Sequence, residues 1–132
     1  MILLQFFNEG LMAKPKKILK KGIYSLKFKY ARKIKNRDDL DAVLFLFKEQ
    51  TTNETIQRTI ILNNEAQSNL SLFIKKLSDN QESITNDSEL TILEKINKYR
   101  ENDYKAIIEP NKTQTYNNIT AIMAVKGGQY EN

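Results

Sequence analysis

A long stretch of alternating residues, from Gly22 to Ile34 (GIYSLKFKYARKI), constrains the fold of this chain more than any other feature. Its first apolar positions are Tyr24, Leu26, Phe28 and Tyr30. Lysines and small residues occupy the positions between them. A period of two places alternate side chains on opposite faces of a β-strand. The stretch therefore predicts a long strand with one apolar face and one basic face.

Four further strands follow from the residue pattern. Residues 40–49 (LDAVLFLFKE) are apolar on both faces, which is typical of a strand that lies in the centre of a sheet or carries aromatic side chains toward a partner. Residues 55–62 alternate as a third strand. Residues 104–109 and 116–125 predict a closing hairpin whose turn begins at Pro110.

A helical segment separates the third strand from the fourth. Apolar residues spaced three and four apart predict a first helix, which Asn63 or Asn64 can cap, and a second helix from about Ser88 to Tyr99 has Asn86 as its expected N-cap. Three strands, a helical segment and two strands are the arrangement of an OB fold. We therefore predict a mainly β fold with α-helices, namely a five-stranded OB-type barrel with a helical insertion between strands 3 and 4.

The chain of 132 residues suits one domain. We expect a flexible N-terminal extension over residues 1–17, a barrel domain over residues 18–126 and a short tail over residues 127–132. Residues 1–11 are apolar but lack the basic start of a signal peptide, and Met12 opens a polar stretch, so our hypothesis is that translation begins at Met12. No apolar run approaches the length of about 20 residues that a membrane helix needs, so we expect no membrane partner.

The chain contains neither cysteine nor histidine. Structural zinc sites that use these ligands, thiol nucleophiles and imidazole bases are therefore excluded. We find no Gly-rich phosphate loop and no acidic metal loop in the sequence. Glu94 and Glu101, seven residues apart on or just after a helix, are better explained as solvated charges than as a catalytic pair. We expect a protein that is not an enzyme and that holds no cofactor or metal.

The charge of the chain is concentrated near its start. Residues 1–37 hold eleven Lys and Arg residues against one acidic residue, whereas the rest of the chain is net acidic. A local excess of this size predicts an anionic partner. The alternative is a solvated basic strand that blocks aggregation at a sheet edge.

Several segments together resemble a known family. They are the opening of the first strand at Gly22 and Tyr24, the aromatic second strand, the run RTIILNNEAQSNLSLFIKKL and the final hairpin YKAIIEPNKTQTYNNITAI. This pattern resembles the OB-fold single-stranded DNA-binding proteins of bacteriophages and related mobile elements, over roughly residues 18–125. The resemblance implies a sequence-tolerant single-stranded DNA binder that acts in DNA replication or recombination in the cytoplasm of a bacterial host. Such proteins often end in a long acidic tail that recruits partners, but here only Glu131 is acidic.

Single strands are held by basic grooves that follow the phosphates and by aromatic side chains on which bases stack. The candidate phosphate contacts are Lys27, Lys29, Arg32, Lys33, Lys35 and Arg37. For stacking we favour Phe45 and Phe47, which share one face of the second strand, and expect Leu44 and Leu46 on the core face. The remaining candidates are Arg58 in the third strand and Lys112 and Tyr116 in the final hairpin.

Two alternatives to single-stranded DNA binding remain open. The chain could instead be an RNA-binding OB domain, or a phage-encoded interaction module or inhibitor that docks an acidic host protein through its basic face. The sequence does not fix whether the chain forms homo-oligomers or binds host or phage replication and recombination proteins.

Overall fold

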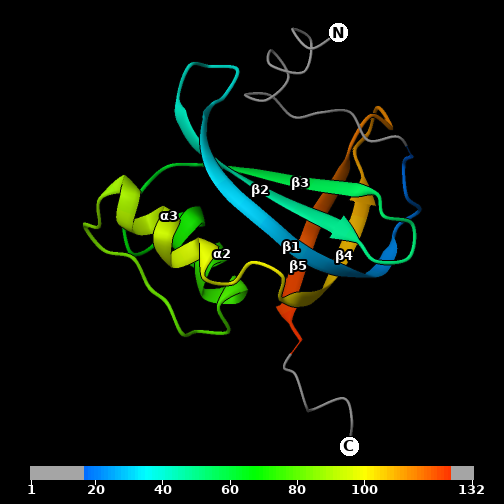
Figure 1. Ribbon diagram of the computed structural model, residues 1–132. Coiled ribbons are helices and arrows are strands. Elements are labelled where there is room, and N and C mark those ends of the chain that lie inside the picture. The colour runs from blue at the N-terminus through cyan, green and yellow to red at the C-terminus, as the bar shows by residue number, and fades with distance from the viewer. Residues whose placement is uncertain (1–16, 126–132) are drawn as a thin grey trace, which may run out of the picture.

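The structure is a computed structural model, and it describes residues 17–125. Five strands and two helices follow one another along this part of the chain (Figure 1). The strands are β1 (Gly22–Lys35), β2 (Asp41–Glu49), β3 (Thr55–Ile61), β4 (Asp103–Pro110) and β5 (Asn117–Ala124). The helices α2 (Asn69–Leu77) and α3 (Glu89–Asn97) lie between β3 and β4 in the sequence. The prediction of a mainly β chain with five strands is confirmed.

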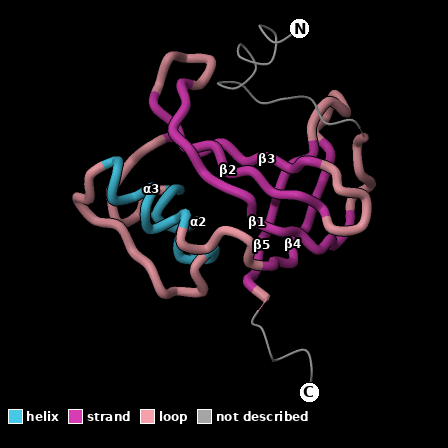
Figure 2. The backbone as a smooth tube through the Cα atoms, in the orientation of Figure 1, coloured by secondary structure: helices cyan, strands magenta, loops and turns pink. Residues whose placement is uncertain are grey.

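All five strands form one antiparallel sheet in the order β3-β2-β1-β4-β5. The central strand β1 serves two partners along its length (Figure 2). Its first part, Gly22–Lys27, pairs with β4, and its later part, Leu26–Lys35, pairs with β2. The sheet is open, because within residues 17–125 β3 and β5 share no strand pairing although they lie close to each other.

A β-bulge in β1 changes which side chains face the core. The pairing with β2 shifts between Phe28 and Tyr30, so Lys29 is the extra residue. Phe28 lies inside, but after the bulge Ala31 is the next buried residue and Tyr30 is half-buried on the opposite face. The prediction that Tyr30 shares the apolar face of Phe28 is therefore wrong, because one inserted residue reverses the alternation.

The core is built around aromatic side chains from one face of the sheet. The ring of Phe28 lies 5.3 Å from that of Phe47, and the ring of Phe45 lies 4.7 Å from that of Phe73 on α2. Tyr104 of β4 packs edge-on against Phe47 and donates a hydrogen bond to the Leu77 carbonyl. Burial keeps the pKa of Tyr104 well above its usual range.

Both helices begin at a serine. The side chain of Ser68 accepts a hydrogen bond from the amide of Ser71 at the start of α2, and Ser88 accepts one from the amide of Thr91 at the start of α3. The predicted caps at Asn63 or Asn64 and at Asn86 are wrong, because Ser has the same capping ability and lies closer to each helix. Asn86 instead adopts a left-handed backbone conformation with φ of 58°.

The side chain of Asn97 joins the helix α3 to the backbone of β1. The Asn97 amide donates a hydrogen bond to the Ala31 carbonyl and accepts one from the Ala31 amide. These two bonds satisfy the backbone of β1 beyond its bulge, where β4 has already left the strand. Ile92 and Ile96 face the core, whereas Leu90 is 69% exposed.

No helix within residues 17–125 is long and apolar enough to cross a membrane. The expected N-terminal extension, the proposed start at Met12 and most of the expected C-terminal tail fall on residues 1–16 and 126–132, outside the described part of the chain.

Candidate nucleic-acid interface

The four candidate lysines of β1 each contact a carboxylate. Lys27 lies 2.9 Å from Asp103, and Lys29 lies 2.7 Å from Glu101. Lys33 lies 2.9 Å from Glu89, and Lys35 lies 2.8 Å from Asp41. All four of these acids come from the later, net acidic part of the chain. The fold therefore neutralises much of the basic excess that is concentrated near the start of the sequence.

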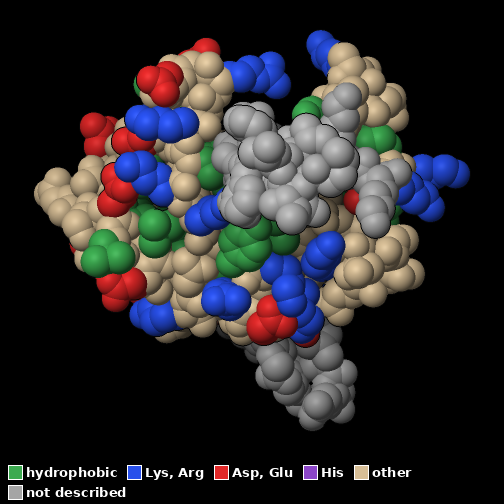
Figure 3. Space-filling model, turned by 45° about the horizontal axis from the view of Figure 1, so that its top comes forward, with side chains coloured by type: hydrophobic (Ala, Val, Ile, Leu, Met, Phe, Trp, Pro, Cys, Tyr) green, Lys and Arg blue, Asp and Glu red, His purple; other side chains and the backbone are tan. Residues whose placement is uncertain are grey.

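Some of these ion pairs shift the pKa values of their members. A hydrogen bond from Lys35 holds the pKa of Asp41 below its usual value, and one from Lys29 does the same for Glu101. The pKa of Lys33 is raised by its bond to Glu89. Figure 3 shows acidic side chains beside basic ones on the face that it presents, rather than one continuous basic area. The four lysines are thus not the free cations that the sequence predicts.

The two candidate stacking residues lie in the core. Phe45 and Phe47 are both 0% exposed, so neither can stack on a base. Leu44 and Leu46 lie on the opposite face of β2, as their register with β1 and β3 requires. The predicted assignment is therefore wrong for the two phenylalanines, whereas Leu44 is buried as predicted, in a second cluster with Ile34 and Ala42. The physical reason is that the large aromatic rings fill the space between the sheet and α2, which smaller side chains would leave empty.

The opposite face of β1, β2 and β3 forms a regular array of nine side chains, which we call the outer face. The register aligns Tyr30 with Leu46 and Gln57, and it aligns Arg32 with Leu44 and Thr59. The third row consists of Ile34, Ala42 and Ile61. The outer face thus has an apolar middle strand flanked by an aromatic ring, a guanidinium, an amide and a hydroxyl.

Polar atoms on the outer face are buried without a partner. Within residues 17–125, Arg32 Nε, Gln57 Oε1 and Thr59 Oγ1 have no hydrogen bond. Gln57 is only 8% exposed. A buried polar atom that forms no hydrogen bond costs about 1–3 kcal/mol, so three on one face require an explanation. A ligand that displaces the groups covering these atoms would satisfy them with its own donors and acceptors.

Arg32 is placed beside an aromatic ring. Its guanidinium carbon lies 6.0 Å from the centre of the Tyr30 ring. Arg32 forms no ion pair within the described residues, unlike the four candidate lysines. An arginine next to an aromatic side chain offers both a charge for a phosphate and flat surfaces for a base. Tyr30, Gln57 and Thr59 were not among the predicted site residues, because finding them requires the bulge to be known.

Arg58 has a structural role in the described chain. Its Nη1 donates a hydrogen bond of 2.7 Å to the carbonyl of Ile119, and its guanidinium carbon lies 5.5 Å from the centre of the Phe73 ring. This contact joins β3 to β5 across the open side of the sheet. The side chain of Arg58, one of the candidate site residues, thus has two partners within the described residues.

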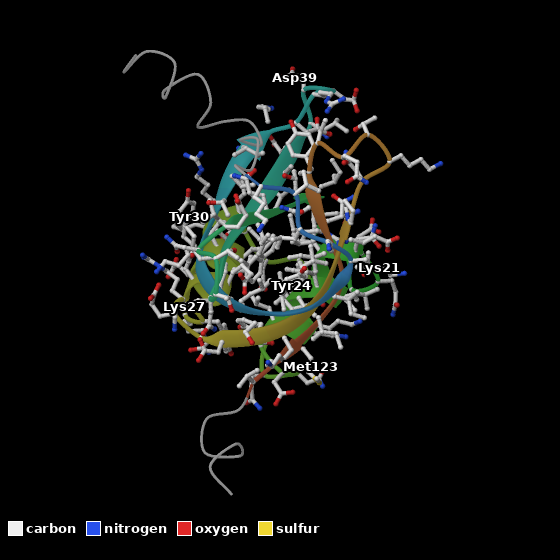
Figure 4. All side chains as sticks on the ribbon, turned by 90° about the vertical axis from the view of Figure 1, so that its right-hand side faces the viewer. Lys21, Tyr24, Lys27, Tyr30, Asp39 and Met123 are labelled. Atoms are coloured by element: carbon white, nitrogen blue, oxygen red, sulfur yellow. The ribbon has the colours of Figure 1, made fainter. Side chains whose placement is uncertain are left out.

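The two long hairpins lie at the same end of the molecule in Figures 1 and 4. One joins β1 to β2 and contains the exposed Arg37, and the other joins β4 to β5 and contains the exposed Lys112. Neither cation forms an ion pair within residues 17–125. Tyr116 is half-buried, and its amide donates to Asn111 Oδ1 within the second hairpin. Arg37 and Lys112 therefore remain available for an anionic ligand.

The described residues contain no group of three or more acidic, Cys or His side chains that could hold a metal ion. Comparison of the chain with family models, curated proteins and solved structures gives no match.

Proposed function

We propose that the chain is a single-stranded DNA-binding protein with an OB-type barrel, of the kind that phages and mobile elements use in replication or recombination. Support for the barrel comes from the strand order around β1 and from the short distance between the edge strands β3 and β5, which Arg58 bridges. In an OB-type barrel the second and third strands carry the binding surface. The outer face lies on these same strands and on β1.

The observation that carries the proposal is the set of unpartnered polar atoms on the outer face. Arg32, Gln57 and Thr59 surround an apolar floor, and Tyr30 supplies a ring beside them. A nucleotide matches this combination, because its base can stack on Tyr30 while its polar edge and sugar bond to Gln57 and Thr59. Its phosphate can pair with Arg32.

The cations of the two hairpins, Arg37 and Lys112, extend this site along the path of a bound DNA strand. Arg37 and Lys112 lie at the same end of the molecule and are free to contact successive phosphates. The paired lysines of β1 contribute less, because each would have to exchange its carboxylate for a phosphate. Exposed ion pairs contribute only about 0–1 kcal/mol. Replacing the carboxylate by a phosphate therefore costs little free energy, and it adds little to the affinity for DNA.

The direct test is binding of labelled single-stranded DNA, RNA of the same sequence and duplex DNA by fluorescence anisotropy over a salt series. We expect the single DNA strand to bind most tightly, and we expect Arg32→Ala to reduce the salt slope by about 0.7 because one phosphate contact is lost. The matched control is Lys76→Ala, which removes one exposed charge from α2 and should change nothing.

Three results would contradict the proposal. Absence of binding at low salt would favour a protein partner instead. Tighter binding of RNA would favour an RNA-binding OB domain. Equal effects of Arg32→Ala and Lys76→Ala would show that the outer face is not the site.

A further inference from the structure

A second surface of the sheet exposes large apolar side chains. On the outward side of β1, β4 and β5, Ile23 is 73% exposed, Ile107 is 37% exposed and Met123 is 63% exposed. The register places Ile23 beside Ile107, Ile107 beside Ala121, and Met123 beside Lys105 in the next row. These side chains therefore form one patch across three neighbouring strands, which we call the apolar patch. Outward positions of an antiparallel sheet are normally polar, so an apolar cluster there indicates a contact surface.

The charges along β4 are arranged symmetrically about the middle of the apolar patch. The outward residues of β4 are Lys105, Ile107 and Glu109, in the order basic, apolar and acidic. Lys105 donates to Ser25 Oγ but forms no ion pair within the described residues, and Glu109 lies 4.0 Å from the exposed Lys21. Both charges are thus available to a partner.

We propose that the apolar patch is the surface through which the chain associates with a second copy of itself. A two-fold axis through Ile107 would place the two β4 strands antiparallel, with Ile107 against its equivalent. Each Lys105 would then face Glu109 of the other copy, so the dimer would contain two equivalent ion pairs between Lys105 and Glu109. A two-fold interface must be self-complementary in this way. Sheets that pack face to face keep their strands within about 30° of each other, which this arrangement permits.

The second copy leaves the outer face free. The apolar patch uses the part of β1 before the bulge, and the outer face uses the part after it. Figure 4 shows Met123 at the end of the molecule away from the hairpin tip at Asp39, whereas Tyr30 lies nearer to that tip. The inference does not depend on what binds the outer face.

Charge exchange on the full-length chain tests the arrangement. Sedimentation equilibrium over a concentration series should give a dimer, and Lys105→Glu should weaken it by roughly a hundredfold because like charges then face each other. Glu109→Lys should do the same. The double variant Lys105→Glu with Glu109→Lys should restore the dimer, which a merely destabilised fold would not do.

Replacement of exposed apolar side chains by lysine is the second test of the dimer. Ile23→Lys and Met123→Lys should give monomers with unchanged circular dichroism, because both side chains are exposed. Leu90→Lys is the matched control, since Leu90 is equally exposed but lies on α3, and it should leave the dimer intact. A wild-type chain that is monomeric at every concentration would overturn the proposal. So would a dimer that survives Ile23→Lys, or a double charge exchange that fails to restore association.

Discussion

The outer face and the apolar patch share the strand β1 but differ in what they leave unsatisfied. The outer face buries polar atoms without hydrogen bonds, at Arg32, Gln57 and Thr59. The apolar patch exposes hydrocarbon, at Ile23 and Met123. Unpaired polar atoms are stabilised by a partner with directional donors and acceptors, whereas exposed hydrocarbon is stabilised by any surface that excludes water. One strand can therefore carry two kinds of contact, provided that its alternation is interrupted between them.

Removing the bulge tests how it separates the two surfaces. Deletion of Lys29 takes out the extra residue and should keep Tyr30 and Arg32 on the outer face, because Phe28 and Tyr30 would then alternate regularly opposite Phe47 and Leu46. The core side chains keep their places, so we expect a folded variant with a cooperative unfolding transition. The measurement is urea denaturation followed by circular dichroism.

The control for this deletion is Lys29→Ala, which keeps the length of the strand and should fold normally. A deletion variant without a cooperative transition would show that the extra residue is itself required for the fold.

The inside and outside of β2 can be separated by two alanine substitutions. Phe47→Ala should cost about 3–5 kcal/mol of stability, because it leaves a cavity beside the buried rings of Phe28 and Tyr104. Leu46→Ala should cost much less, because Leu46 is only half-buried on the outer face. Chemical denaturation of both variants measures the difference. A larger loss of stability for Leu46→Ala than for Phe47→Ala would indicate that the phenylalanines lie on the binding face.

Substitution of Gln57 tests whether the outer face is a ligand site or an ordinary buried surface. Gln57→Leu keeps the size of the side chain and removes the unpartnered amide oxygen. Stability should stay the same or rise, whereas affinity for single-stranded DNA should fall by about 1–2 kcal/mol because a hydrogen bond to the ligand is lost. Anisotropy and thermal melting on the same sample test both expectations. A loss of stability without a loss of affinity would show that Gln57 has only a structural role.

Substitution of Asp41 should have the smallest effect on DNA affinity among these variants. Asp41→Asn removes the acid that pairs with Lys35, and the freed lysine should raise affinity for single-stranded DNA a few-fold. The pKa of Asp41 is lowered by that pair, so its contribution to stability is present above the ordinary carboxyl pKa and is lost as the pH falls through the lowered value. Titration of oligonucleotide binding at neutral pH measures the gain. Unchanged affinity would place Lys35 away from the phosphates.

The strands could be predicted from the sequence because each has a strong pattern of its own. The segment from Gly22 to Ile34 alternates, and residues 40–49 have a continuous apolar character that predicts a central position. Their faces could not be predicted in the same way. A bulge at Lys29 carries no glycine to mark it, and a strand that is apolar on both sides gives no indication of which side meets the helices.

The candidate site was harder to predict than the fold because its charges are paired across long separations. Lys27 and Lys29 meet Asp103 and Glu101, more than seventy residues later in the chain. A count of charges along the sequence contains no information on such pairs. Arg32 and Arg37, two of the predicted phosphate contacts, form no ion pair within the described residues, whereas the placing of Gln57 and Thr59 beside Arg32 depends on the register of three strands.

The contact between Arg58 and Ile119 has a consequence for the motion of the molecule. Between the edge strands β3 and β5, it is a side-chain hydrogen bond that spans the gap, in place of a backbone ladder. Rotation of one flexible side chain is enough to release it, on the nanosecond scale of rotamer changes rather than that of unfolding. The two edges are then held only by the buried core that Ile60, Ile119 and Ile122 share, while every strand pair stays intact. Amide hydrogens along β3 and β5 should accordingly exchange with solvent sooner than those of β1, and the molecule should be more compressible across this gap than along its strands.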